Sequence, residues 1–157
     1  METETIDVVN PPLRLLAAFA QHFPDREPSV VLQAPGRDLW TAAVVLGTQH
    51  YRIEALDLRA KTVFSRQSAK RRETILRRPL PRWSRYAAGV MLALDAVIDV
   101  PGIVALICGD EAPGPRYDYG MGILFAALWH EIAGESARDR DLIALVDRVQ
   151  REYVAWE

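Results

Sequence analysis

Ile103-Val-Ala-Leu-Ile-Cys108 leads into Gly109-Asp-Glu-Ala-Pro-Gly-Pro-Arg-Tyr-Asp-Tyr-Gly-Met-Gly122, and an apolar run from Ile123 to Ile132 follows. The first segment is rich in β-branched residues and apolar on both faces, which predicts a central strand. The last segment is apolar nearly all round, which predicts a buried helix. A glycine-rich loop between a strand and a helix offers free backbone N–H groups and the positive end of a helix dipole. The stretch therefore predicts a phosphate site, which Arg116 would favour and Asp118 would oppose.

The same loop also has an ordinary structural interpretation. Glycine and proline are common in connections that bind nothing, and Asp118 would then be the N-cap of a structural helix. A glycine-rich loop is not a specific signal by itself, so both interpretations stay open at this point.

Outward from this stretch, the chain predicts a layered α+β domain. Apolar runs and alternation predict strands, and apolar positions three and four residues apart predict helices. Ser136 and Asp139 have the spacing of a capping box at the start of the last helix. Because strands and helices fall largely into separate runs, an α+β fold is favoured over a doubly wound one. The remaining expected strands are 29–34, ending in a turn at Pro35-Gly36, then 40–47, 51–55 and 62–65, and the remaining helices are 13–23, 83–97 and 136–156.

Size and composition indicate an ordinary globular protein. A chain of 157 residues fits one domain with a buried core, and its net charge of -2 gives no reason to expect nucleic acid or a membrane as a partner. Cys108 is the single cysteine, which fits a reducing compartment and a core role. The acidic beginning lacks the basic region of a secretory signal, and no apolar stretch approaches the ~20 residues that span a bilayer. We expect a cytoplasmic protein with an acidic tail over 1–12 and one domain over 13–157.

Residues 59–85 form a basic segment, with 10 of the 19 lysines and arginines against one acid, Glu73. Such a segment could contact the phosphates of a nucleic acid, with Phe64, Trp83 and Tyr86 stacking on bases. Trp83 and Tyr86 lie on the apolar stripe of a predicted helix, however, so a core role fits them better. A solvated basic surface is the favoured interpretation, and nucleic acid is not the expected partner.

Metal-ligand spacing is also absent from the chain. His130-Glu131 lies on a predicted helix, but Gly134 stands where a second histidine would be needed. No metal site is therefore predicted from the residues.

Taken together, these segments resemble the N-terminal domain of the GHMP small-molecule kinases, and galactokinase most closely. The likeness runs from about Leu13 to Glu157, and it rests on the order and spacing of several short motifs. These motifs are Phe19 to Phe23 with Pro28, Ala34-Pro-Gly-Arg37, Trp83-Ser-Arg-Tyr86 with Gly89-Val90, Gly102 and Gly109-Asp110, and Ala137 to Glu157 with Arg151-Glu-Tyr-Val154.

The resemblance implies both a fold and a chemistry. The fold would be that of the second domain of ribosomal protein S5, a layered sheet with helices on one face. The chemistry would be transfer of the ATP γ-phosphoryl group to a sugar hydroxyl with Mg²⁺, and Arg37 would be a catalytic residue that neutralises charge on the transferred group. In the alternative interpretation, Arg37 is an ordinary arginine that follows a Pro-Gly turn and pairs with Asp38 or another surface acid. The implied phosphate loop is Pro113, Gly114, Arg116, Tyr117, Asp118, Tyr119 and Gly120.

Departures from the family pattern predict lost activity. Asp38-Leu-Trp-Thr-Ala-Ala43 follows Arg37, where galactokinases have a Gly-Glu-His-Thr-Asp-Tyr run that binds the sugar. Arg116 stands where the phosphate loop has a glycine, and Asp118-Tyr119-Gly120 replaces three serines. The family's catalytic aspartate would lie beyond Glu157, and its C-terminal domain is absent from this sequence.

The sequence therefore predicts a galactokinase-like domain that is degenerate and inactive as this chain, a pseudokinase. A sugar, ATP and Mg²⁺ are the ligands that the resemblance implies. Two alternatives belong to other classes. One is a non-catalytic binding or assembly module, in which a homodimer or a protein partner covers the surface left by the missing C-terminal half. The other is a nucleic-acid-associated protein that uses residues 59–85.

Overall fold

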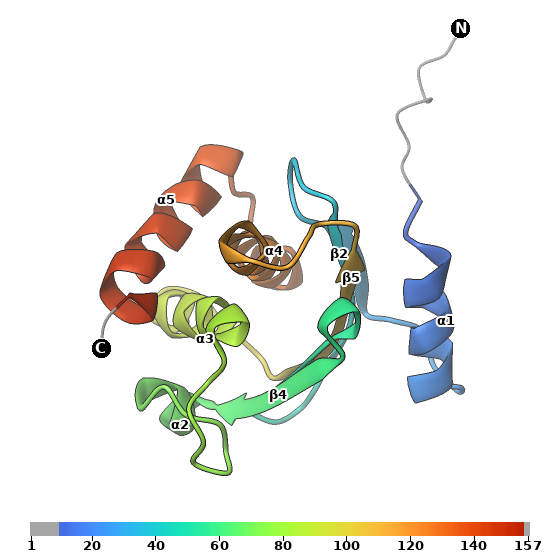
Figure 1. Cartoon of the computed structure of the whole chain (residues 1–157), viewed down its shortest axis with the longest axis horizontal. Coiled ribbons are helices and arrows are strands. Elements are labelled where there is room, and N and C mark those ends of the chain that lie inside the picture. The colour runs from blue at the N-terminus through green and yellow to red at the C-terminus, as the bar shows by residue number, and fades with distance from the viewer. Residues whose placement is uncertain (1–9, 156–157) are drawn as a thin grey trace, which may run out of the picture.

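The computed structural model describes residues 10–155 of the chain. Within this range the chain forms one five-stranded sheet between layers of helices (Figure 1), so the predicted α+β architecture is confirmed. Residues 1–9 of the predicted acidic tail, and Trp156 of the predicted last helix, lie outside the described residues. The elements are α1 (Leu13–His22), β1 (Val30–Gln33), β2 (Leu39–Val45), β3 (His50–Ala55), the 3₁₀ turn η2 (Leu56–Leu58), β4 (Ala60–Ser65), α2 (Arg66–Lys70), α3 (Arg82–Asp95), β5 (Ile103–Gly109), α4 (Pro115–Ala133), α5 (Asp139–Val149) and the π-helical turn η3 (Gln150–Val154).

Strand β5 lies at the centre of the sheet, as predicted. The strand order is β1-β2-β5-β3-β4, and β5 is antiparallel to β2 and parallel to β3. Its alternate side chains enter two apolar cores: Ile103, Ala105 and Ile107 enter one, and Leu106 and Cys108 the other. A strand between two cores has no wet face, which explains its uninterrupted apolar sequence.

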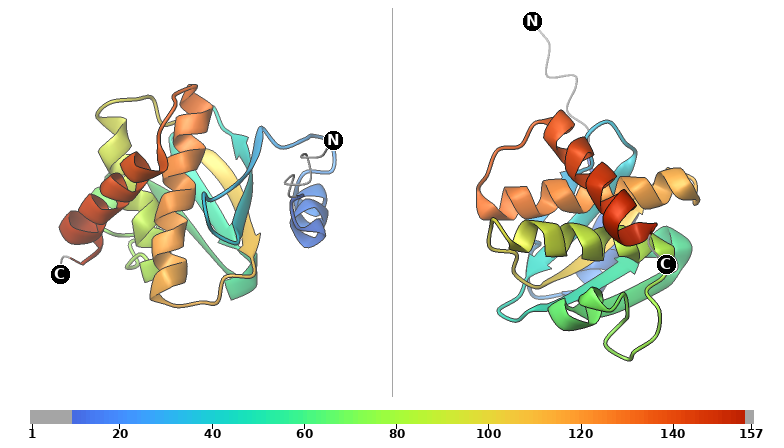
Figure 2. Two further views of the ribbon diagram at one scale, coloured as in Figure 1. Left: turned by 90° about the horizontal axis from the view of Figure 1, so that it is seen from above. Right: turned by 90° about the vertical axis from the view of Figure 1, so that its left-hand side faces the viewer.

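Helices cover both faces of this sheet. Helices α3, α4 and α5 cover one face, and α1 lies alone against the other (Figure 2). The layered arrangement is confirmed, with one difference from the expectation of helices on one face. The reason is that β2 and β5 also present apolar side chains outward, and Leu15 and Phe19 of α1 remove Trp40 and Leu106 from water.

Helix α4 begins at Pro115 rather than near Ile123. The predicted loop 109–122 is therefore a short connection followed by two turns of helix. Proline suits the first helical position because its φ is already helical and its missing N–H is not needed there. The N-cap is Gly114, with φ +142°, so the expectation that Asp118 caps the helix is wrong: Asp118 lies in the first turn.

The last helix also differs from its prediction at both ends. It begins at Asp139 rather than Ser136, and its N-cap is Arg138, whose backbone N–H donates to the Asp141 carboxylate at 3.3 Å. The predicted pair of Ser136 and Asp139 therefore does not form the cap. Beyond Val149 the chain widens into the π-helical turn η3.

Two glycines let the helices of this layer approach closely. A Cβ at Gly122 of α4 would lie 2.8 Å from Cγ1 of Val146 in α5. A Cβ at Gly89 of α3 would lie 2.5 Å from Cγ1 of Val149. These contacts set the spacing of α3, α4 and α5, and with it the position of the first residues of α4 and α5. Among residues 10–155, no helix has both the length and the apolar character needed to cross a bilayer.

Candidate ligand pocket

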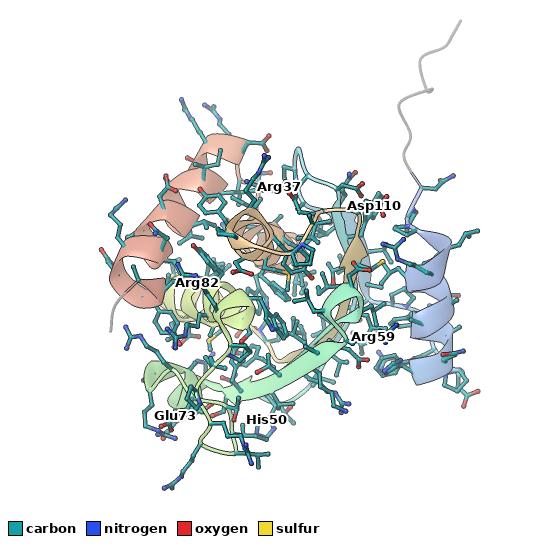
Figure 3. The ribbon with its side chains drawn as sticks, viewed as in Figure 1. Arg37, His50, Arg59, Glu73, Arg82 and Asp110 are labelled. Atoms are coloured by element: carbon teal, nitrogen blue, oxygen red, sulfur yellow. The ribbon has the colours of Figure 1, made fainter. Side chains whose placement is uncertain are left out.

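A pocket of about 630 Å³ opens at the end of the sheet where β1 and β5 end. Four segments form its walls: the turn after β1, the connection after β5, the start of α4 and the start of α5. Figure 3 shows Arg37 and Asp110 at this end of the molecule. The pocket therefore brings together residues that are about a hundred positions apart in sequence.

Pro35 and Gly36 place Arg37 at the pocket. The Arg37 N–H donates to the Ala34 carbonyl at 3.1 Å and closes a four-residue turn. Gly36 has φ +69°, a region that glycine enters without steric cost. Proline followed by glycine is the pattern of a type II turn, so the turn predicted at Pro35-Gly36 is confirmed.

The guanidinium of Arg37 is held by contacts within the protein. Its Nη1 donates to the Arg116 carbonyl at 3.4 Å and lies 3.8 Å from Oε1 of Glu111. Its Cζ lies over the ring of Tyr119, 5.3 Å from the centroid. Gly120 lies beneath this side chain, since a Cβ there would be 3.3 Å from Cδ of Arg37. Arg37 therefore joins the turn after β1 to the first two turns of α4.

The first turns of α4 point their aromatic side chains inward. Tyr117 is fully buried, its hydroxyl has no hydrogen-bond partner among the described residues, and burial raises its pKa well above the usual range. Tyr119 donates its hydroxyl to Oδ1 of Asp147 at 2.6 Å, and burial together with that carboxylate raises its pKa to about 12. Asp118 is half-buried, and burial raises its pKa although Arg82 opposes the shift. Tyr119 therefore joins α4 to α5, Asp118 faces Arg82 of α3, and Tyr117 belongs to the core.

Two of the eight predicted site residues line the pocket, Arg37 and Arg116. The other six lie elsewhere: Pro113 and Gly114 in the connection before α4, Tyr117 in the core, Asp118 and Tyr119 toward α3 and α5, and Gly120 beneath Arg37. The structure thus divides the predicted phosphate loop between a pocket wall and a helix interior.

The pocket has more negative than positive side chains. Its lining includes two guanidinium groups, Arg37 and Arg116, against four carboxylates, Asp38, Asp110, Glu111 and Asp139. Sequence reasoning did not select the carboxylates. Asp38 and the pair at 110–111 adjoin the predicted motifs and could have been found from that position, whereas Asp139 reaches the pocket only through the packing of α5. In the described part of the chain, no group of three or more His, Cys, Asp or Glu residues is placed to hold a metal ion.

A second polar cluster fixes the end of β5 beside the pocket. The Asp57 carboxylate accepts a hydrogen bond from the Gly109 N–H at 2.8 Å and lies 3.3 Å from Arg14 of α1. Arg14 also donates to the Gly109 carbonyl at 2.7 Å and lies 3.4 Å from Asp110. A Cβ at Gly109 would lie only 2.0 Å from the Asp38 carbonyl. Helix α1 and η2 therefore position the pocket wall that follows β5.

Seven of the ten lysines and arginines in the basic segment 59–85 are exposed, as expected for a solvated surface, whereas Arg66 and Arg72 contact other elements. Arg66 pairs with Asp95 at 2.5 Å, and Arg72 donates to the Tyr153 carbonyl at 3.0 Å while its guanidinium lies over the Tyr153 ring. Trp83 and Tyr86 are buried in the core, so the core interpretation of these two aromatic residues is confirmed.

Solved structures of similar fold include a galactokinase and two mevalonate kinases. The galactokinase of Lactococcus lactis, complexed with galactose, matches 92% of this chain and 43% of its own at 14% identity, with a TM-score of 0.67. The mevalonate kinase of Methanococcus jannaschii matches 73% of this chain and 36% of its own at 10% identity, with a TM-score of 0.55. A further mevalonate kinase structure matches 73% of this chain and 37% of its own at 11% identity, also with a TM-score of 0.55. At these identities the likeness establishes the fold, that of GHMP kinase domains.

The described fold corresponds to part of each kinase, since the chain spans less than half the length of any of the three. No protein-family model matches the sequence, and no curated protein matches it.

Proposed function

We propose that this chain is a GHMP-kinase-like domain that binds a small hydroxylated molecule in the pocket beside Arg37 and does not transfer phosphoryl groups as this chain. The observation that carries the proposal is the charge of the pocket, which has four carboxylates and two guanidinium groups. A site for a nucleoside triphosphate needs the opposite balance, because the triphosphate chain is itself strongly negative.

The contacts of Arg37 support the absence of phosphoryl transfer. An arginine that stabilises a transferred phosphoryl group must direct its N–H groups at the place where negative charge develops. The Arg37 guanidinium instead faces the Glu111 carboxylate, the Arg116 carbonyl and the Tyr119 ring. Its role is to hold the turn after β1 against α4.

The start of α4 supports the same conclusion. A phosphate at a helix N-terminus is held by backbone N–H groups of the first turn. Pro115 has no N–H, and Asp118 adds a carboxylate to that turn. The residues present therefore do not fit ATP with Mg²⁺.

The chemistry of the pocket favours hydroxyl and ammonium groups. Carboxylates accept hydrogen bonds from both groups, and the Arg116 guanidinium can donate to hydroxyl oxygens. Ile123, Leu142 and Ile143 add an apolar wall against which the C–H face of a sugar ring can pack. A volume of about 630 Å³ is within the range of small-molecule sites. The galactose in the galactokinase of similar fold supports a sugar as the class of ligand.

A charge series of one sugar tests the proposal. We expect galactosamine to bind more tightly than galactose in isothermal titration, and galactose 1-phosphate to bind least tightly, because only the ammonium group is attracted by the carboxylates. Asp38→Asn should weaken galactosamine binding by up to about fivefold, which is the size of one exposed charge interaction. Asp99→Asn, at the opposite end of β5, is the matched control and should leave binding unchanged.

Nucleotide binding is tested separately. ATP with Mg²⁺ should not raise the melting temperature, and labelled ATP should not phosphorylate galactose or galactosamine. A rise of several degrees with ATP, or tightest binding by galactose 1-phosphate, would contradict the proposal, since a ligand of the folded state must stabilise it.

A further inference from the structure

The connection between α2 and α3 projects from the body of the molecule as a tight turn (Figures 1 and 2). Its tip consists of two adjacent aliphatic residues, Ile75 and Leu76, and both are exposed. Hydrogen bonds fix this tip: Oγ1 of Thr74 accepts from the Leu76 N–H at 3.2 Å, and the Ile75 N–H donates to the Val63 carbonyl of β4 at 3.0 Å. The structure therefore presents two apolar side chains to solvent in a preorganised position, which lowers the entropic cost of burying them against a partner.

Arg77 completes the turn in a strained backbone conformation. Its φ of +64° lies in the left-handed region, which glycine enters without steric cost and a residue with a Cβ does not. The Arg77 N–H donates to the Thr74 carbonyl at 2.9 Å, a bond that any residue except proline can form. The side chain is exposed and forms no ion pair with another residue of the described range 10–155. Folding therefore gives no reason for an arginine at this position, whereas a negatively charged partner would.

A hollow of about 370 Å³ lies between this tip and the adjoining strands β3 and β4. Val63, Ile75 and Leu76 give it apolar walls. The charged residues that line it are all cations: Arg52, Lys61 and Arg78. These three side chains are exposed, and none of them is ion-paired within the part of the chain that the structure describes. The hollow therefore combines an apolar surface with unpaired positive charge.

We propose that this tip surface binds an anionic phospholipid bilayer. The tip surface consists of two aliphatic residues and the cations beside them: Ile75, Leu76, Arg52, Lys61, Arg77 and Arg78. The aliphatic side chains enter the boundary between head groups and acyl chains, where their methyl groups leave water. The cations contact the phosphates and carboxylates of the head groups. An anionic phospholipid joins both chemistries in one molecule, which is the combination that the tip and the hollow present.

The structure disfavours two other macromolecular partners of a basic surface. An extended peptide would add to the β4 edge, but the Val63 carbonyl there already accepts a hydrogen bond from Ile75. A nucleic acid would need aromatic side chains on which bases stack, but the aromatic residues of the basic segment are buried: Phe64, Trp83 and Tyr86. A projecting apolar tip suits a bilayer, because it can be inserted there without a matching cleft.

The distribution of charge over the molecule would orient it on such a bilayer. Arg52 of the tip surface lies beside Val104 at the start of β5, whereas the pocket beside Arg37, with its four carboxylates, lies where β5 ends. The net charge of -2 conceals this asymmetry. An anionic bilayer attracts the basic end and repels the acidic end, so the pocket faces water. The tip surface shares no residue with the lining of that pocket, so this proposal stands apart from the proposed function.

Co-sedimentation of the full chain with lipid vesicles tests the proposal. We expect binding to phosphatidylcholine vesicles that contain about 30% phosphatidylserine, weaker binding at about 0.5 M salt, and no binding to phosphatidylcholine alone. No binding to the anionic vesicles, or equal binding to both kinds of vesicle, would overturn the proposal. A polyglutamate peptide or a DNA oligonucleotide that binds while the anionic vesicles do not would assign the tip surface to another partner.

Exchange of one exposed leucine tests the apolar contact. Leu76→Ser should weaken binding to the anionic vesicles about tenfold, because this side chain leaves water on the bilayer. Leu13→Ser is the matched control, since Leu13 of α1 is 83% exposed and Leu76 is 75% exposed, and it should leave binding unchanged. Equal losses for the two variants would contradict the placement of the tip in the bilayer.

Exchange of Arg77 separates membrane binding from folding. Arg77→Gly should weaken vesicle binding about fivefold through the loss of one charge. The melting temperature should stay unchanged or rise, because glycine relieves the left-handed φ. Arg140→Gln is the control, since Arg140 is exposed beside Asp139 of the pocket at the other end of the molecule. Equal losses of binding at Arg77 and Arg140 would exclude a specific role of the tip surface.

A fluorescent label tests the position of the tip directly. Cys108 is buried, so a polarity-sensitive dye should react with Leu76→Cys at the introduced thiol alone. Anionic vesicles should shift the emission of this label to shorter wavelengths, as expected for entry into an apolar layer, and should not shift the emission of a label on Leu13→Cys. A shift at both positions, or at neither, would contradict the proposed orientation.

Discussion

The guanidinium of Arg37 lies over the ring of Tyr119, with its Cζ 5.3 Å from the ring centroid. Tyr119 in turn donates its hydroxyl to Asp147 at 2.6 Å and meets the edge of Tyr86. The turn after β1 is thereby connected to α4, α5 and α3 through a single side chain. The arginine that resembles a catalytic residue is, in its contacts, part of the packing of the domain.

Arg37→Ala should lower the melting temperature by about 2–4 °C. A cation–π contact of this kind contributes about 0.5–1 kcal/mol, and the pair with Glu111 adds a small amount. Arg116→Ala is the control at the same pocket, because Arg116 accepts the hydrogen bond from Arg37 through its backbone carbonyl, which alanine keeps. Thermal unfolding followed by circular dichroism measures both variants, and equal melting temperatures for them would argue against a structural role of Arg37.

The tyrosines should resist ionisation in the folded protein. Burial raises the pKa of Tyr153 to about 12, with Arg72 and Arg85 opposing, and burial with the Asp147 carboxylate raises that of Tyr119 to about 12. Because the folded pKa lies above the unfolded value of 10.0, the neutral phenol groups contribute to the free energy of unfolding. This contribution is complete below pH 10 and is lost as the pH rises toward 12.

Absorbance at 295 nm measures this titration. We expect little phenolate absorbance between pH 10 and 11, and then a cooperative increase together with loss of helical circular dichroism. Normal titration of all five tyrosines near pH 10, with the fold intact, would show that the rings are accessible.

Asp118→Asn should stabilise the protein at pH 7 by about 1–3 °C. Burial raises the pKa of Asp118 despite Arg82, so the charged form is disfavoured in the folded state at neutral pH. The folded state binds the proton of Asp118 more tightly than the unfolded state does. The contribution of Asp118 to the free energy of unfolding therefore rises as the pH falls toward the ordinary carboxyl pKa of 3.8. The advantage of the asparagine should therefore shrink between pH 7 and pH 4. An advantage that grows on acidification would exclude this account.

Two glycines of α4 should respond oppositely to alanine. A Cβ at Gly122 would meet Val146 at 2.8 Å and Tyr86 at 3.1 Å, so Gly122→Ala should cost about 1–3 kcal/mol of unfolding free energy. At Gly120 the nearest atoms are 3.3–3.4 Å away on Arg37 and Leu39, and the arginine is flexible. Gly120→Ala should be neutral or stabilise by up to about 1 kcal/mol through helix propensity. Urea denaturation compares them, and a greater loss at Gly120 would contradict the packing described.

Much of the fold was predictable because the relevant signals are local. The apolar run of β5 placed it at the centre of the sheet, and the alternation of Tyr51, Ile53 and Ala55 identified β3 with one face in the core. Pro35 and Gly36 fixed a turn through their own backbone preferences. The start of α4 was missed because glycines and prolines favour a loop locally, while burial of Tyr117 and the packing of Gly122 favour a helix.

The candidate site was less predictable for a different reason. Arg37 and Arg116 were selected from motifs, but Asp139 joins them only because α5 packs against α4. Likewise the Asp57 carboxylate reaches the Gly109 N–H across 52 positions of sequence. No periodicity or motif signals such a meeting, because it depends on how whole elements are stacked.

The sequence by itself determined most of the strands and helices, which of their faces are apolar, and where the turn before Arg37 lies, since these depend on neighbouring residues. Only the tertiary structure decided what the Arg37 guanidinium contacts and that four carboxylates share its pocket. These properties arise from residues brought together over long separations, where charge and hydrogen-bonding partners are set by packing.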